Sequence, residues 1–94
     1  TSYLQALAAA APDRVKVEVV TRTHERKPLL LVTFTSKDNH ARLEAIRADQ
    51  LALLDPAKSG SVDLARHPVV VNLAYGVHGN EPGTHNAAVL VAYH

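Results

Sequence analysis

The stretch Pro68-Val69-Val70-Val71-Asn72-Leu73-Ala74-Tyr75 leads directly into Gly76-Val77-His78-Gly79-Asn80-Glu81-Pro82-Gly83. Residues 69–75 are almost all apolar and do not alternate with polar residues, which is typical of a strand that is covered on both faces. The glycines and the proline of residues 76–83 predict a tight turn, and residues 84–94 predict a helix that packs on the sheet. This stretch therefore predicts a strand, a turn and a helix, with the strand at the centre of a sheet.

Upstream of this unit, the sequence predicts a helix followed by a β-hairpin. Residues 2–11 are rich in alanine and leucine and end at Pro12, which cannot continue a helix. Residues 15–19 alternate valine with polar residues, the period expected of a strand with one buried face. Residues 29–35 resume with Leu, Val, Thr and Phe, so the two runs are predicted to pair as a hairpin.

A second helix is predicted over residues 40–54, because leucine and isoleucine recur there near helical spacing. Ser36, Asp38 and Asn39 precede it as candidates for the N-cap, and residues 57–67 are typical of a surface loop. The resulting order is helix, strand, strand, helix, strand, helix. It predicts the α/β class, as part of an α/β/α sandwich with a mixed sheet, whose ligand site lies beyond the carboxyl ends of the strands.

The composition excludes several classes of function. Ten basic and nine acidic residues among 94 give a net charge of +1, and the basic residues are scattered, so nucleic acid is not expected as a partner. The longest uninterrupted apolar run, residues 87–93, is far shorter than the roughly 20 residues that span a bilayer, so no membrane partner is expected. Because the chain has no cysteine, any metal site must use histidine and carboxylate ligands.

The chain is expected to be a piece of something longer. With one Phe, no Trp and no Met, its core must be built from Val, Leu, Ile and Ala, which is little for an independent domain of this size. It starts at Thr1 rather than at a methionine, and its last apolar run stops at His94 without Gly, Asn or Pro to end a helix.

His78 and Glu81 are the candidate metal ligands. A histidine and a glutamate three residues apart on a tight turn can direct an imidazole nitrogen and a carboxylate oxygen at one point about 2 Å from each, as Zn²⁺ requires. The four-residue spacing is weak when taken alone, but the glycines at positions 76 and 79 let the backbone turn sharply beside a ligand. The alternative is an ordinary strand-to-helix connection whose polar residues are solvated or cap the helix.

The segment His78–Pro82, which reads H-G-N-E-P, resembles the first zinc-binding motif of the M14 zinc carboxypeptidase family. The preceding apolar run and the following Asn-Ala-Ala of residues 86–88 agree with that motif, and residues 23–25 and 28–30 resemble a hairpin of the same family. The resemblance spans nearly the whole chain. It implies a zinc metallopeptidase of mixed-sheet α/β/α fold that removes residues from the C-terminal end of peptides or cleaves related amides.

By this resemblance, His78 is the first zinc ligand and Glu81 the second in a set of two histidines and one glutamate. The family's third ligand, general base, carboxylate-binding Arg and substrate-binding Tyr lie downstream of the matched positions, so no catalytic residue is expected within this chain. Residues 1–94 are then the N-terminal portion of a single catalytic domain that is inactive alone. The expected cofactor is Zn²⁺, and the expected partners are a peptide substrate and the remainder of the catalytic domain. The resemblance slightly favours an extracytoplasmic location.

The segment departs from the family's pattern at Asn80 and within residues 82–85. Asn80 stands where pancreatic-type members have Arg, and the Pro82-Gly83-Thr84-His85 run replaces the P-S-G-T of bacterial-type members. A local set of His78, Glu81 and His85 would have to converge from a span of only eight residues, so His85 is expected to face solvent or to support the ligands. The other four histidines are expected at the surface: His24, His40, His67 and His94.

Two alternatives to the peptidase stay open. The succinylglutamate desuccinylase and aspartoacylase branch uses a similar H-G-N-E start and hydrolyses small acyl-amino acids, although the helix and hairpin before the motif favour the peptidase. A non-catalytic binding module with a peptidase-like fold belongs to a different class. The third ligand and the general base distinguish the enzymes from that module.

Overall fold

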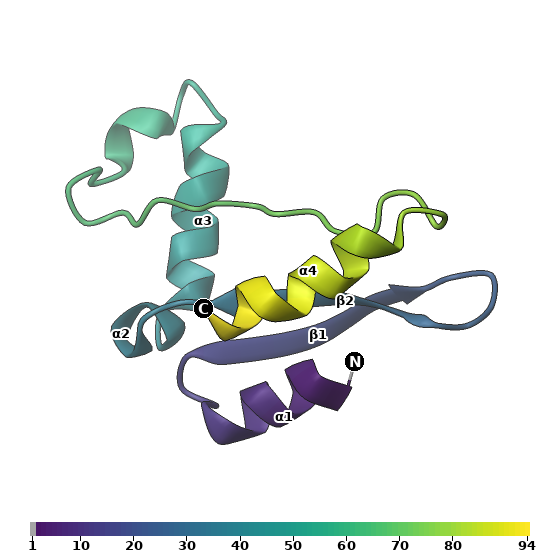
Figure 1. Cartoon of the computed structure of the whole chain (residues 1–94). Coiled ribbons are helices and arrows are strands. Elements are labelled where there is room, and N and C mark those ends of the chain that lie inside the picture. The colour runs from purple at the N-terminus through teal and green to yellow at the C-terminus, as the bar shows by residue number, and fades with distance from the viewer. Residues whose placement is uncertain (1) are drawn as a thin grey trace.

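The computed structural model describes residues 2–94 and combines several helices with a two-stranded antiparallel sheet, which is compatible with the predicted α/β class. The β-hairpin lies at the centre, with α1 along one side and α3 standing at one end, and α4 contacts α1 (Figure 1). The elements in chain order are α1 (Ser2–Ala10), β1 (Val15–Arg22), β2 (Pro28–Phe34), α2 (Lys37–His40), α3 (Leu43–Leu53), the 3-10 turn η1 (Ser59–Ser61) and α4 (Pro82–Tyr93).

The predicted hairpin is confirmed. Val15 lies opposite Phe34 and Val17 opposite Val32, and the register shifts by one residue between Val19 and Thr21. The second helix, predicted over residues 40–54, is present as α3 over residues 43–53, and a separate short helix, α2, forms over residues 37–40. Ser36 caps α2 as expected, since its Oγ accepts a hydrogen bond of 3.3 Å from the amide of Asn39. No helix within residues 2–94 is long and apolar enough to cross a membrane.

An ion pair at the hairpin tip provides a first prediction. Lys27 Nζ lies 2.8 Å from Glu25 Oε2, and this hydrogen bond and charge lower the pKa of the Glu25 carboxyl. Lys27→Ala is therefore expected to raise the Glu25 pKa towards its ordinary value, as measured by NMR titration. Because the folded-state pKa is the lower one, the pair's small contribution to stability is present above the ordinary carboxyl pKa and is lost as the pH falls.

The control for this prediction is Lys16→Ala, which removes a different surface pair, with Glu18 at 3.1 Å. That variant is expected to leave the Glu25 pKa unchanged. A Glu25 pKa that does not respond to Lys27→Ala would contradict the prediction.

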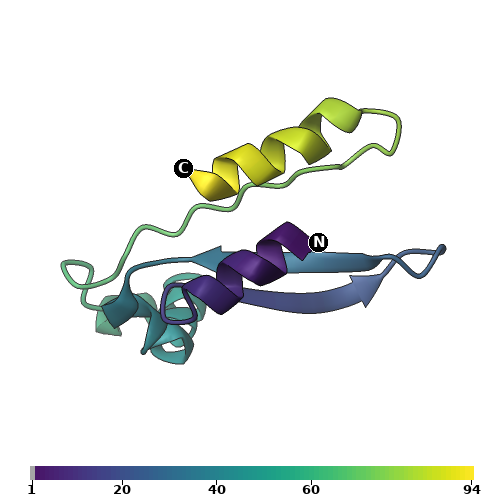
Figure 2. The same cartoon turned by 60° about the horizontal axis from the view of Figure 1, so that its bottom comes forward.

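The core of the described residues is small. The buried apolar residues are Val15 at 8% exposure and Ile46 at 7%. Helix α1 contacts β1 and α4 (Figure 2). The accessible surface is 7508 Å², whereas a compact monomer of 10.1 kDa exposes about 5,300 Å². The radius of gyration is 15.6 Å, against about 12 Å for a compact domain of this length. The fold is therefore open, with much apolar surface facing solvent.

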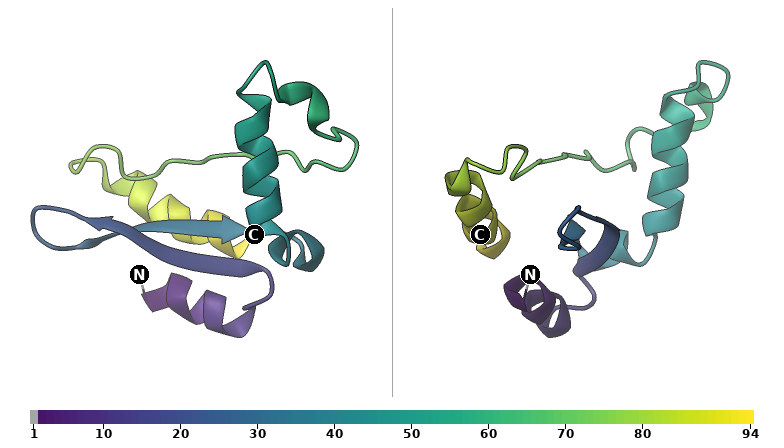
Figure 3. Two further views of the ribbon diagram at one scale, coloured as in Figure 1. Left: turned by 180° about the vertical axis from the view of Figure 1, so that it is seen from behind. Right: turned by 90° about the vertical axis from the view of Figure 1, so that its right-hand side faces the viewer.

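The strand predicted at residues 69–75 is not formed among the described residues, which show only part of the expected order of the sandwich. These residues are extended but unpaired, and the sheet of the described part of the chain is antiparallel rather than mixed. Val69 is 91% exposed and Val71 is 71% exposed. Figure 3 shows the segment running from α3 to α4 apart from the hairpin. An extended segment becomes a strand only when a neighbour pairs with its backbone groups, and β1 and β2 pair with each other.

Candidate metal centre

The turn that carries His78 and Glu81 connects the extended segment to α4. Glu81 is the N-cap residue of α4, and Pro82 occupies the first helical position, where its fixed φ and missing N–H favour a helix start. The Glu81 amide donates a 3.3 Å hydrogen bond to the His78 carbonyl. The backbone therefore closes a turn that places the two side chains on the same side.

The two candidate ligands face each other at the surface. His78 Nδ1 lies 3.1 Å from both Oε1 and Oε2 of Glu81, and the two side chains are 67% and 56% exposed. Two ligand atoms bound to tetrahedral zinc at roughly 2.0–2.2 Å are about 3.4 Å apart. The observed separation therefore needs to widen by only a few tenths of an ångström, and a neutral imidazole and a carboxylate are donors that zinc accepts. The pair fits part of a zinc site.

His85 does not complete the site. Its Nδ1 lies 3.3 Å from the Glu81 carbonyl oxygen, so this nitrogen donates to the backbone. Within residues 2–94 there is no group of three or more His, Cys, Asp or Glu side chains placed to hold one metal ion. The described residues therefore offer two candidate ligands, His78 and Glu81.

The expectation for the other histidines holds only in part. His24 and His94 are exposed, but His40 and His67 are half-buried, and one ring nitrogen of each, His40 Nε2 and His67 Nδ1, is buried. His67 Nε2 lies 2.7 Å from Gln50 Oε1. This contact spans 17 residues, so no local sequence pattern predicts it.

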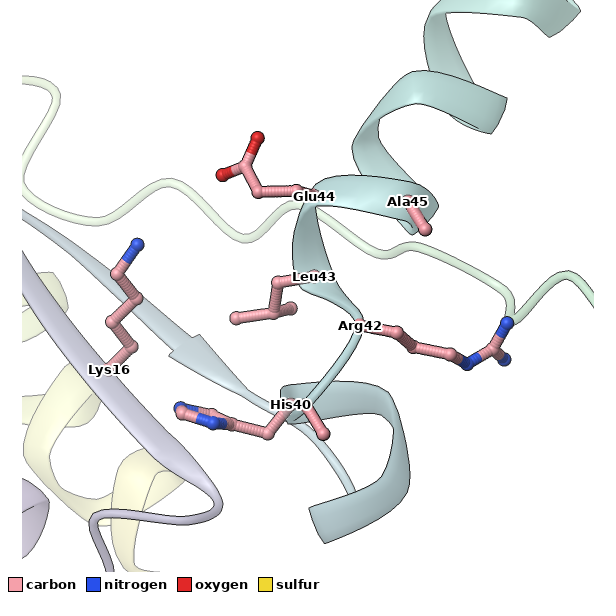
Figure 4. Close-up of a pocket in the computed structure, with 7 residues that line it drawn as sticks. Lys16, His40, Arg42, Leu43, Glu44 and Ala45 are labelled. Atoms are coloured by element: carbon pink, nitrogen blue, oxygen red, sulfur yellow. The ribbon is translucent and has the colours of Figure 1, made fainter.

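A depression lies at the junction of β1, α2 and α3, at the opposite end of the molecule from the His78–Glu81 turn. Figure 4 shows the Lys16 side chain beside it, with the His40 ring extending towards β1 and the Arg42 guanidinium pointing the other way. Arg42 Nη2 donates to Asn39 Oδ1 and to the Arg66 carbonyl, each at 3.0 Å. No local sequence pattern predicts this depression, because only the fold brings Lys16 beside residues 40–45.

The chain matches a known protein family, and the match includes the His78–Glu81 turn. A family model described as zinc carboxypeptidase matches residues 1–94, so the match includes the hairpin, the extended segment and the His78–Glu81 turn. No curated protein and no solved structure matches the chain significantly.

Proposed function

This chain belongs to the zinc carboxypeptidase family, and we propose that it supplies two of the zinc ligands of a metallocarboxypeptidase. His78 binds the metal through an imidazole nitrogen and Glu81 through its carboxylate. The parent protein hydrolyses the peptide bond at the C-terminal end of its substrate. The observation that carries this proposal is the position of His78 Nδ1, 3.1 Å from both carboxylate oxygens of Glu81.

The residues of this chain hold and orient the metal, and they do not perform the proton transfer. When bound, zinc polarises the scissile carbonyl and lowers the pKa of its water ligand to about 7. Both ligand side chains are more than half exposed, so further ligands and a substrate have access to the same side of the turn. The turn and the start of α4 keep the imidazole and the carboxylate together.

The third ligand and the general base are proposed to come from the remainder of the catalytic domain, of which residues 1–94 form the N-terminal portion. The exposed apolar segment at residues 69–75 supports this division, because large contiguous apolar surfaces are uncommon on isolated soluble domains. In the complete domain this segment becomes the central strand. A peptide is the proposed substrate, and the preceding helix and hairpin favour it over a small acyl-amino acid.

The test compares residues 1–94 with the full-length protein that carries the native downstream sequence. We expect elemental analysis to find about one zinc per full-length molecule and clearly less in the short chain. Hydrolysis is measured with a peptide that has a free C-terminus and with an N-acyl amino acid. The full-length protein is expected to cleave the peptide, and the short chain neither substrate.

Each other outcome contradicts a stated part of the proposal. Zinc-dependent peptide hydrolysis by residues 1–94 alone would contradict the division of the site. Preference for the N-acyl amino acid would indicate the amidohydrolase branch. Absence of zinc from both polypeptides would overturn the metal centre and favour a non-catalytic binding module.

A further inference from the structure

We propose that Thr84 and His85 are positioning residues. Their contacts connect the turn that carries His78 and Glu81 to Gly76, at the end of the extended segment, and so raise the affinity of the site for zinc. This inference rests on the proposed function of His78 and Glu81. It concerns two side chains of α4 that contact the backbone of the turn on either side of His78.

The hydroxyl of Thr84 joins two backbone groups on opposite sides of the turn. It donates a 3.0 Å hydrogen bond to the Glu81 carbonyl and accepts a 3.2 Å hydrogen bond from the Gly76 amide. The first bond is one that threonine commonly forms within a helix. The second spans eight residues and connects α4 to the residue two positions before His78. Thr84 therefore closes the loop that contains both ligands.

His85 reinforces the same closure. Its Nδ1 donates to the Glu81 carbonyl at 3.3 Å, so that carbonyl accepts from two side chains of α4. The imidazole ring also lies against Gly76, where an added Cβ would be 2.5 Å from Nε2 and 2.7 Å from Cδ2 of His85. Gly76 has φ of 70°, in the left-handed region that favours glycine. The ring thus occupies the space that a side chain at position 76 would fill.

These contacts act on the ligands through the backbone. The Glu81 carbonyl accepts hydrogen bonds from Thr84 and His85. The Gly76 amide donates to Thr84, and the His85 ring packs against Gly76. His78 lies in the chain between Gly76 and Glu81. A turn restrained at both ends samples fewer arrangements of its side chains, so less conformational entropy is lost when two ligands bind one metal ion. Groups that orient metal ligands typically contribute 10- to 100-fold to metal affinity.

The test measures the Zn²⁺ dissociation constant of the full-length protein by competition with a chelator. Thr84→Val keeps the shape but removes the hydroxyl, and Thr84→Ser restores it. His85→Ala removes the ring donor, and His85→Asn places an amide N–H near the position of Nδ1. We expect Thr84→Val and His85→Ala to weaken zinc binding about 10-fold or more, and the Ser and Asn variants to stay within about threefold of the wild type. His94→Ala, on an exposed histidine at the other end of the same helix, is expected to bind as the wild type.

A His78→Ala variant measured in parallel separates the two proposals. If His78→Ala binds zinc as tightly as the wild type, the proposed metal centre fails, and the positioning role fails with it. If His78→Ala loses zinc while Thr84→Val and His85→Ala retain wild-type affinity, only the positioning role is overturned. It is also overturned if the Ser and Asn variants lose as much affinity as Val and Ala, because the hydrogen bonds would then not be the cause.

Discussion

Replacing His78 by alanine is expected to weaken zinc binding to the full-length protein by on the order of 100- to 1,000-fold. Structural zinc sites with four ligands bind with roughly 10–16 kcal/mol, so one ligand corresponds to about 2.5–4 kcal/mol. Glu81→Ala is expected to have an effect of the same order, because the carboxylate also supplies the negative charge of the pair. The measurement is chelator competition, followed by elemental analysis after dialysis.

The matched control for this prediction is His24→Ala. His24 is an exposed histidine near the hairpin tip, and it has no place in the proposed site. Its removal is expected to leave the dissociation constant unchanged. A loss of affinity in His24→Ala as large as that in His78→Ala would show that zinc binds non-specifically to surface histidines, and the assigned ligands would then be wrong.

Val71→Asp is expected to change the stability of the short chain little and to destabilise the full-length protein strongly. In residues 1–94 the Val71 side chain is 71% exposed, so a carboxylate there stays hydrated and the unfolding transition changes little. In the complete domain we propose that residues 69–75 form a strand covered on both faces. An unpaired charge there is strongly destabilising, by about 3–5 kcal/mol, so the variant is expected to unfold at much lower urea concentration or to fail to fold.

Leu64→Asp is the matched control for that comparison. Leu64 is 69% exposed and lies in the loop between η1 and the extended segment, where no strand is proposed. We expect a change in the free energy of unfolding of at most about 0.5 kcal/mol in both polypeptides. If Val71→Asp is as well tolerated as Leu64→Asp in the full-length protein, residues 69–75 do not form an inner strand.

The features that sequence analysis predicted correctly depend on residues close together in the chain. Alternating valines at residues 15–19 indicated the first strand of the hairpin, and Ser36 indicated a cap that the structure contains. The helix predicted over residues 84–94 is present as α4, which begins two residues earlier, at Pro82. The proximity of His78 and Glu81 also follows from a tight turn, because three residues of separation leave the two side chains within reach of each other.

The features that sequence analysis missed depend on contacts between distant segments. The spacing of residues gave no sign that the Gly76 amide would meet the Thr84 hydroxyl, or that the His67 ring would pack beside Gln50. The apolar character of residues 69–75 is plain in the sequence, but their pairing is not a local property. Hydrogen bonds within a turn or helix need only the neighbouring residues, whereas a strand needs backbone groups from another segment. For this protein, local spacing therefore predicts that His78 and Glu81 lie close together, while the contacts of Thr84 and His85 with Gly76 emerge only from the folded arrangement.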